Sequence, residues 1–238
     1  MNSEKGKLYL IPTTLGDTEP LEVLPISVKK VIEQTNIYIV ENEKTARRFI
    51  KKISSGKSQS SLQIFLLNKF TNANILPEFL EPCLKGTNVG LLSEAGCPGI
   101  ADPGADVVKL AHQKNIKVVP LVGPSSILMA MMSSGMNGQS FTFNGYLPID
   151  KNLRKNEIKR LERLSFEQNQ SQIFIETPYR NNKMLEDLCN VLGNNTLVCV
   201  ACDITLPTEF IKTQTVSEWK KNIVDLHKRP TIFIIHKI

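Results

Sequence analysis

The sequence predicts an α/β protein made of two α/β domains. Short apolar segments alternate with amphipathic or charged segments along the chain, and glycine and proline punctuate the joins. Alternation of this kind is typical of sheets whose strands are connected by covering helices. A chain of 238 residues is long enough to form two compact cores. We place the domains at 1–120 and 121–238, packed tightly because no low-complexity linker marks the boundary.

The first half alternates strands with helices. Its strands are short apolar runs that end at a proline or a polar loop, at 7–11, 36–40, 62–67, 88–92 and 116–122. Its helices are expected at 23–33, 45–52, 75–85 and from 105 onward. Pro82 predicts a kink or break in the third of these helices because proline lacks the N–H that a helix needs. The alternation predicts a parallel sheet covered on both faces.

The second half continues the same pattern. Its strands are expected at 141–148, 171–176, 196–202 and 230–236. Its helices are expected at 127–133, 151–163, 182–192 and 216–226. The hydroxyls of Ser125 and Ser126 suit the N-terminal cap and first turn of the first helix.

Composition narrows the class of partner. The formal net charge is +6, which suits a polyanionic partner without proving one. No apolar run reaches the ~18 residues that a membrane helix requires. The first residues lack the apolar core of a signal peptide, so we expect a cytoplasmic protein with no membrane contact.

The sequence lacks the motifs that mark several enzyme classes. The chain has neither Gly-x-Gly-x-x-Gly after the first strand nor a P-loop, which disfavours Rossmann dehydrogenases, ordinary Rossmann methyltransferases and P-loop enzymes. Gly-x-Ser-x-Gly is also absent. Cys199 and Cys202 form a single Cys-x-x-Cys without a second half or a nearby histidine, so buried strand thiols are favoured over a redox or metal site. We expect no metal.

The segment 93–104, Ser-Glu-Ala-Gly-Cys-Pro-Gly-Ile-Ala-Asp-Pro-Gly, is the most informative part of the chain. It lies between a buried strand and a helix. Such loops expose backbone N–H groups at the carboxyl end of a sheet, where α/β proteins hold ligands. Five glycines and prolines in twelve residues exceed what an ordinary connection needs.

Three other segments could carry chemistry. The turn at Gly123 can present main-chain groups and two hydroxyls to a ligand, or it can serve only as a helix cap. At the end of the strand 171–176, Arg180 could grip a phosphate and Tyr179 could stack on a base, although a structural turn is almost as well supported. Glu41 could act as a base or hydrogen-bond acceptor, or as a surface helix cap.

Six segments in order resemble the tetrapyrrole methylase superfamily of S-adenosylmethionine-dependent methyltransferases, and most of all its branch that methylates a ribose 2′-hydroxyl of small-subunit rRNA. The matching segments are Gly6-Lys-Leu-Tyr-Leu-Ile-Pro-Thr-Thr-Leu-Gly-Asp, Glu41-Asn-Glu-Lys, the loop 93–104, Leu121-Val-Gly-Pro-Ser-Ser, Phe143-Asn-Gly-Tyr-Leu-Pro and Glu176-Thr-Pro-Tyr-Arg. The resemblance implies two α/β domains with the cofactor cleft between them, a homodimer, and rRNA or the small ribosomal subunit as partner.

By position, the resemblance also implies a set of site residues. Those expected to bind S-adenosylmethionine are Pro12, Glu94, Ala95, Gly96, Ile100, Ser125, Ser126, Tyr146 and Leu147. Glu41 and Glu176 are the candidates for polarising the 2′-hydroxyl or accepting its proton, and Lys44 and Arg180 for holding phosphates.

The chain departs from that branch in its late segment. The branch has Arg-Glu-Leu-Thr-Lys where this chain has Cys202-Asp-Ile-Thr-Leu-Pro-Thr-Glu, without the arginine and the lysine. Two alternatives to rRNA methylation therefore stay open. One is methylation of a small tetrapyrrole-like molecule, and the other is an RNA- or ribosome-binding homologue that has lost turnover.

Overall fold

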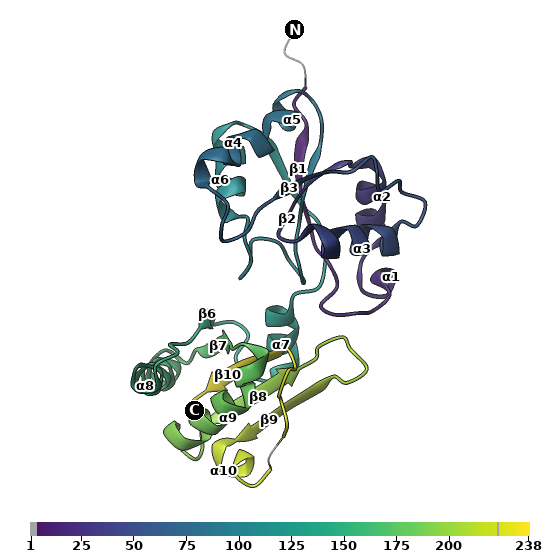
Figure 1. The fold of residues 1–238 in the computed structure, drawn as a ribbon. Helices are drawn as coiled ribbons and strands as arrows, with labels where there is room; N and C mark the ends of the chain where they lie inside the picture. The colour runs from purple at the N-terminus through teal and green to yellow at the C-terminus, as the bar shows by residue number, and fades with distance from the viewer. Residues whose placement is uncertain (1–3, 223) are drawn as a thin grey trace. The chain divides into compact units, whose positions relative to one another are not determined.

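The computed structural model describes residues 4–222 and 224–238. The chain divides into two compact units, Met1–Ser125 and Ser126–Ile238, and each unit is built around its own five-stranded sheet. The mixed α/β architecture predicted from the sequence is confirmed (Figure 1).

The first unit is a parallel sheet in the order β3-β2-β4-β1-β5. Its strands are β1 (Lys7–Ile11), β2 (Ile37–Val40), β3 (Gln63–Leu66), β4 (Val89–Leu92) and β5 (Lys117–Pro120). Its helices are α1 (Pro20–Val23), α2 (Ile26–Gln34), α3 (Glu43–Ile53), the 3₁₀ turn η1 (Ala73–Ile75), α4 (Leu76–Phe79), α5 (Glu81–Leu84) and α6 (Ala105–Gln113).

Both faces of this sheet are covered, as the sequence predicts. Helices α4, α5 and α6 bury one apolar cluster against it, and α1, α2 and α3 bury a second cluster on the opposite face. Figure 1 shows the two groups of helices on either side of β1, β2 and β3. Because all five strands run the same way, their carboxyl ends meet at a single edge.

Two helices of this unit are divided by proline. The expected helix at 23–33 begins only at Ile26, because Pro25 holds the preceding Leu24 in extended backbone and thereby ends α1. The break expected at Pro82 is present, since α4 ends at Phe79 and α5 begins at Glu81.

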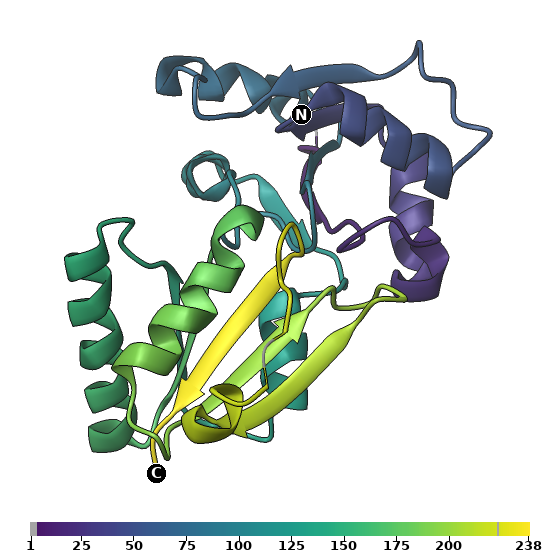
Figure 2. The same ribbon diagram turned by 60° about the horizontal axis from the view of Figure 1, so that its bottom comes forward.

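The second unit has a mixed sheet in the order β6-β7-β10-β8-β9, in which only β6 and β7 run parallel. Its strands are β6 (Phe141–Tyr146), β7 (Ser171–Ile175), β8 (Leu197–Cys202), β9 (Phe210–Thr215) and β10 (Thr231–His236). Its helices are α7 (Ser126–Ser134), α8 (Lys151–Gln168), the 3₁₀ turn η2 (Pro178–Arg180), α9 (Asn181–Val191) and α10 (Val216–Trp219). Figure 2 shows α7 and α9 on opposite faces of this sheet.

Two expectations for the second unit are wrong. The sequence predicts no strand at Phe210–Thr215, because Phe-Ile-Lys-Thr-Gln-Thr is largely polar, but the structure has β9 there as an edge strand that pairs only with β8. The helix expected over 216–226 ends at Trp219, where the Asn222 side chain bonds the Glu218 carbonyl oxygen, and Leu226 lies in the core; residue 223 of that range is outside the described residues.

Candidate active site

The carboxyl edge of the first sheet gathers most of the residues that the sequence singles out. Glu41 follows β2, Glu94 follows β4 and Pro12 follows β1. The segments after β2 and β4, the loop after β3 and the start of α6 enclose a cavity of about 650 Å³, and both Glu41 and Glu94 line it. A second hollow of about 220 Å³ lies on the other side of Glu94, against helix α3.

The Gly/Pro loop at this edge is an ordered structure rather than a simple connection. Ser93 Oγ donates to Asp102 Oδ2 at 2.8 Å and accepts from the Ala95 backbone N–H at 3.1 Å, which ties the two ends of the loop together. Gly96 has a φ of 76°, and a Cβ there would meet the Pro124 carbonyl oxygen at 3.1 Å. The loop therefore needs its glycine, as the sequence pattern indicates.

Three separate segments meet beside this loop. The Thr13 backbone N–H donates to the Gly96 carbonyl oxygen at 3.0 Å, and the Cys97 thiol lies 3.4 Å from the Pro124 carbonyl oxygen. A Cβ at Gly123 would lie 2.3 Å from Pro12 Cγ, so only glycine permits this close approach. The segments that follow β1, β4 and β5 are thus locked together within one unit.

Three carboxylates sit at this edge in different surroundings. Thr45 Oγ1 on α3 donates to both oxygens of Glu94, at 2.7 and 2.9 Å. Burial raises the pKa of Asp102, although its hydrogen bond from Ser93 opposes the shift. Partial burial, followed by the nearby charges of Asp102 and Glu94, raises the pKa of Glu41. An environment of this kind favours a group that can take up a proton.

The remaining predicted residues of the first unit lie around this edge without entering the cavity wall. Ala95 and Ile100 are exposed on the loop, and Lys44 is exposed on the first turn of α3. Asn42 caps that turn, accepting from the Lys44 and Thr45 backbone N–H groups. The cap fixes the backbone at Lys44, whose side chain is exposed to solvent.

The second unit holds a smaller set of predicted residues near the carboxyl ends of β6 and β7. Tyr146 is exposed and Leu147 is buried directly after it. Glu176 is buried and accepts from the Thr177 backbone N–H and from Arg180 Nη2, both at 2.6 Å. The structure therefore joins Glu176 and Arg180 as an ion pair. Ser126, by contrast, begins helix α7.

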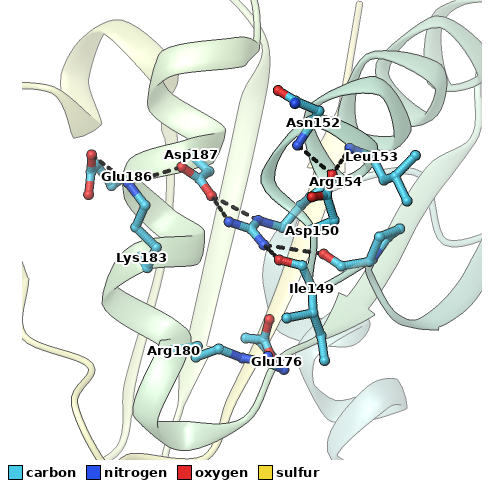
Figure 3. A network of polar contacts seen from close by, with 11 residues as sticks. Ile149, Asp150, Asn152, Leu153, Arg154, Glu176, Arg180, Lys183, Glu186 and Asp187 are labelled. Carbon is cyan, nitrogen blue, oxygen red and sulfur yellow. Dashed lines mark hydrogen bonds and ion pairs between the residues drawn. The ribbon is translucent and has the colours of Figure 1, made fainter.

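A buried arginine organises the segment after Leu147. Arg154 on α8 donates through Nε to Asp187 Oδ2 on α9 at 2.8 Å, and through Nη1 to the carbonyl oxygens of Pro148 and Ile149 at 3.2 and 2.6 Å (Figure 3). Both side chains of the ion pair are about one-tenth exposed. Sequence reasoning missed this pair because Arg154 lies in a helix whose charged residues are mostly solvated.

A second arginine stabilises the divergent late segment. Arg229 Nε donates to Asp203 Oδ2 at 2.8 Å, and Arg229 Nη2 donates to the Thr208 carbonyl oxygen at 2.7 Å. This contact bridges residues that are 26 positions apart in the chain, so no local pattern predicts it. The segment that lacks the branch's arginine and lysine is therefore ordered by an arginine from elsewhere.

In the described part of the chain, no three histidine, cysteine, aspartate or glutamate side chains are arranged to hold a metal ion. Over the same residues, the structure contains no helix with the length and apolar character needed to cross a membrane.

Comparison with known proteins decides the family. The family model described as tetrapyrrole (corrin/porphyrin) methylases matches residues 7–220. The chain belongs to this family. It is a methyltransferase, and methyltransferases of this family generally use S-adenosylmethionine.

Curated relatives of this methylase carry the name ribosomal RNA small subunit methyltransferase I. The protein of that name from Vibrio cholerae is 27% identical over 232 residues, which cover 96% of this chain and 76% of the relative. The one from Escherichia coli O157:H7 is 25% identical and covers 98% and 79%. The one from Bacillus subtilis strain 168 is 29% identical and covers 91% and 70%.

Solved structures show the same fold. The methyltransferase CobJ superposes with a TM-score of 0.65 at 15% identity, covering 98% of this chain and 94% of that one. The cobalt precorrin-4 methyltransferase CbiF superposes with a TM-score of 0.62 at 13% identity, covering 97% and 94%.

The residues at the carboxyl edge of the first sheet fit S-adenosylmethionine in their chemistry. That cofactor carries a positive sulfonium and a positive ammonium group, and carboxylates stabilise both. Glu94 and Asp102 supply such charges at this edge, and they lie close enough to Glu41 to raise its pKa. The main-chain groups of the loop 93–104 supply further polar contacts, which a Gly/Pro-rich segment leaves accessible.

Proposed function

We propose that this methyltransferase modifies a ribose 2′-hydroxyl of small-subunit rRNA, with S-adenosylmethionine as methyl donor. The observation that carries the proposal is the similarity over more than nine-tenths of the chain to proteins named for small-subunit rRNA methylation. The formal net charge of +6 supports a polyanionic acceptor.

Within this proposal, Glu41 rather than Glu176 accepts the hydroxyl proton. Two donors already engage the buried Glu176 carboxylate, one of them the guanidinium of Arg180. Glu41 lines the open cavity, and its environment raises its pKa. A general base needs access to its substrate and a pKa nearer the working pH, and Glu41 has both.

The other predicted residues then act by binding. The bound cofactor supplies an electrophilic methyl group, and the chain orients the acceptor toward it. Pro12, Glu94, Ala95, Gly96, Ile100, Ser125, Ser126, Tyr146 and Leu147 remain our proposed cofactor contacts. Arg180, held in position by Glu176, is left with guanidinium surface for a phosphate, and the exposed Lys44 can bind another.

The test is transfer of labelled methyl groups from S-adenosylmethionine by the purified protein. Acceptors are small ribosomal subunits that lack the modification, large subunits as a control, and a tetrapyrrole precursor. Label in small-subunit RNA alone supports the proposal. Label in the tetrapyrrole alone would assign a small-molecule methylase instead. Cofactor binding by calorimetry without transfer to any acceptor would indicate a homologue that has lost turnover.

A further inference from the structure

We propose that the loop after β3 is the acceptor-nucleotide site, in which the Phe70 ring is a platform for one nucleobase and Lys69 neutralises an adjacent phosphate. The inference rests on the proposed function and extends it to residues that neither the sequence motifs nor the comparisons single out. Both residues line the cavity of about 650 Å³ that also contains Glu41.

The cavity has the size and composition of a ligand site. Its volume falls within the range of roughly 300–1,000 Å³ that small-molecule pockets occupy. Its wall combines apolar surface from Leu67, Leu76 and Val107 with an equal share of polar and charged residues, Glu41 and Asn42 among them. Apolar walls with a few convergent polar groups are typical of sites that orient a flat organic ligand.

Phe70 is presented to solvent rather than packed. The residue is 83% exposed, although phenylalanine gains free energy by burial. Lys69 Nζ lies 4.9 Å from the centroid of its ring. The ammonium group covers one face of the ring and leaves the other face open to a base.

The turn that carries Phe70 is held by its own hydrogen bonds. Asn68 Oδ1 accepts from the Phe70 backbone N–H at 2.9 Å, and the Asn68 backbone N–H donates to Thr71 Oγ1 at 2.8 Å. Thr71 Oγ1 in turn donates to the Leu66 carbonyl oxygen at 3.2 Å, at the end of β3. An exposed ring on an ordered turn is ready to stack without a large ordering cost.

The charges of the wall favour a nucleotide over a tetrapyrrole. Three carboxylates, Glu41, Glu94 and Asp106, line the cavity, whereas Lys69 is the lone basic side chain in its described lining. This wall repels any anion, but a tetrapyrrole precursor would bring several carboxylates to it, whereas one nucleotide brings a single phosphate that Lys69 can neutralise. A nucleotide brings hydroxyl and amine donors for the carboxylates, a π-face for Phe70 and one nearby phosphate for Lys69.

The experiment measures binding without relying on methyl transfer. The probe is a short single-stranded RNA with one pyrrolocytidine, whose fluorescence is quenched by stacking. Wild-type protein, Phe70→Leu, Phe70→Trp and Phe166→Leu are compared. Phe166 is an exposed phenylalanine on α8 and serves as the matched control. Stacking on an aromatic side chain contributes about 1–3 kcal/mol per base, so Phe70→Leu should weaken binding about tenfold and abolish the quench.

Each outcome separates this inference from the proposed function. Phe70→Trp should retain the quench and Phe166→Leu should bind like the wild type. If Phe70→Leu binds the probe and quenches its fluorescence like the wild type, Phe70 does not stack a base. The same conclusion follows if the wild type does not bind the probe, even where rRNA becomes methylated. If binding depends on Phe70 and no RNA is methylated, the platform is supported and the proposed function fails.

Discussion

Glu41 differs from its neighbouring carboxylates in its hydrogen bonding. Glu94 is bonded by Thr45 and Asp102 by Ser93, whereas no described group donates a hydrogen bond to the Glu41 carboxylate. Partial burial and the charges of Asp102 and Glu94 raise its pKa. Of these three carboxylates, Glu41 is therefore the one that is free to accept a proton from a ligand.

Replacing Glu41 by glutamine should slow methyl transfer while preserving cofactor binding. The substitution keeps the shape and removes the base, and a positioned general base contributes about 100- to 10,000-fold to a rate. Single-turnover transfer to rRNA measures the loss, and calorimetry with S-adenosylmethionine tests binding. A variant that transfers methyl groups at the wild-type rate would exclude Glu41 as the base.

Asp102→Asn should shift the pH profile without weakening the fold. The base works when deprotonated, and the charge of Asp102 raises the pKa of Glu41, so its removal should move the acid limb of kcat/KM to lower pH. Burial also raises the pKa of Asp102 itself. Its contribution to stability is present at low pH and lost as the pH rises through that pKa, so the substitution should not lower the urea midpoint at neutral pH.

If the acid limb of kcat/KM lies at the same pH in Asp102→Asn as in the wild type, Glu41 is not the group whose titration produces that limb. The same experiment on Glu41→Gln is the control, because that variant should lose the limb altogether.

At the scale of elements, the Arg154–Asp187 pair joins α8 to α9 and fixes the segment after β6. Arg154→Met should destabilise the protein by up to about 3–5 kcal/mol, because it leaves the nearly buried Asp187 carboxylate with only the more exposed Lys183 as a partner, at 3.3 Å. Urea unfolding measures this cost.

The matched control for that pair lies on the same helix. Arg160 is paired with Glu157 in a more exposed setting, and Arg160→Met should cost less than about 1 kcal/mol. The double variant Arg154→Met/Asp187→Leu should recover much of the lost stability, since two apolar side chains remove the stranded charge. Equal losses for Arg154→Met and Arg160→Met would contradict the role assigned to burial.

Sequence patterns predict elements well where one physical cause dominates. The alternation of apolar runs identifies the parallel sheet of the first unit and its two covered faces, because apolar helix faces pack against both sides of that sheet. The polar edge strand β9 has no such pattern. The boundary at Ile26 depends on Pro25, and the end of α10 depends on a side-chain contact from Asn222.

The candidate site likewise contains residues that local sequence patterns predict and residues that they do not. The loop 93–104 and Glu41 could be found from sequence, because strand ends and glycines mark them. The ion pairs of Arg180 and Arg229, and the exposed ring of Phe70, could not be found in that way. Their roles depend on which side chains the fold brings together, and only the coordinates show those contacts.

For the whole molecule, the basic excess predicts salt-dependent RNA binding. Lys151 and Lys155 are exposed on α8 and line a groove of about 350 Å³ together with Lys183. Phosphate contacts release counterions, so the slope of log K against log salt should fall by about 2 in Lys151→Ala/Lys155→Ala, with cofactor affinity unchanged. An unchanged slope would show that this face of α8 is ordinary solvated surface.

The most direct measurement asks which atom receives the methyl group. Small subunits lacking the modification are incubated with the protein and labelled S-adenosylmethionine, and the recovered RNA is hydrolysed in alkali. A methylated 2′-oxygen blocks cleavage of the adjacent phosphodiester bond, so ribose methylation predicts label in one alkali-stable dinucleotide, formed at least about 100-fold more slowly by Glu41→Gln. Label released as mononucleotides, or found only on a small-molecule acceptor, would contradict it.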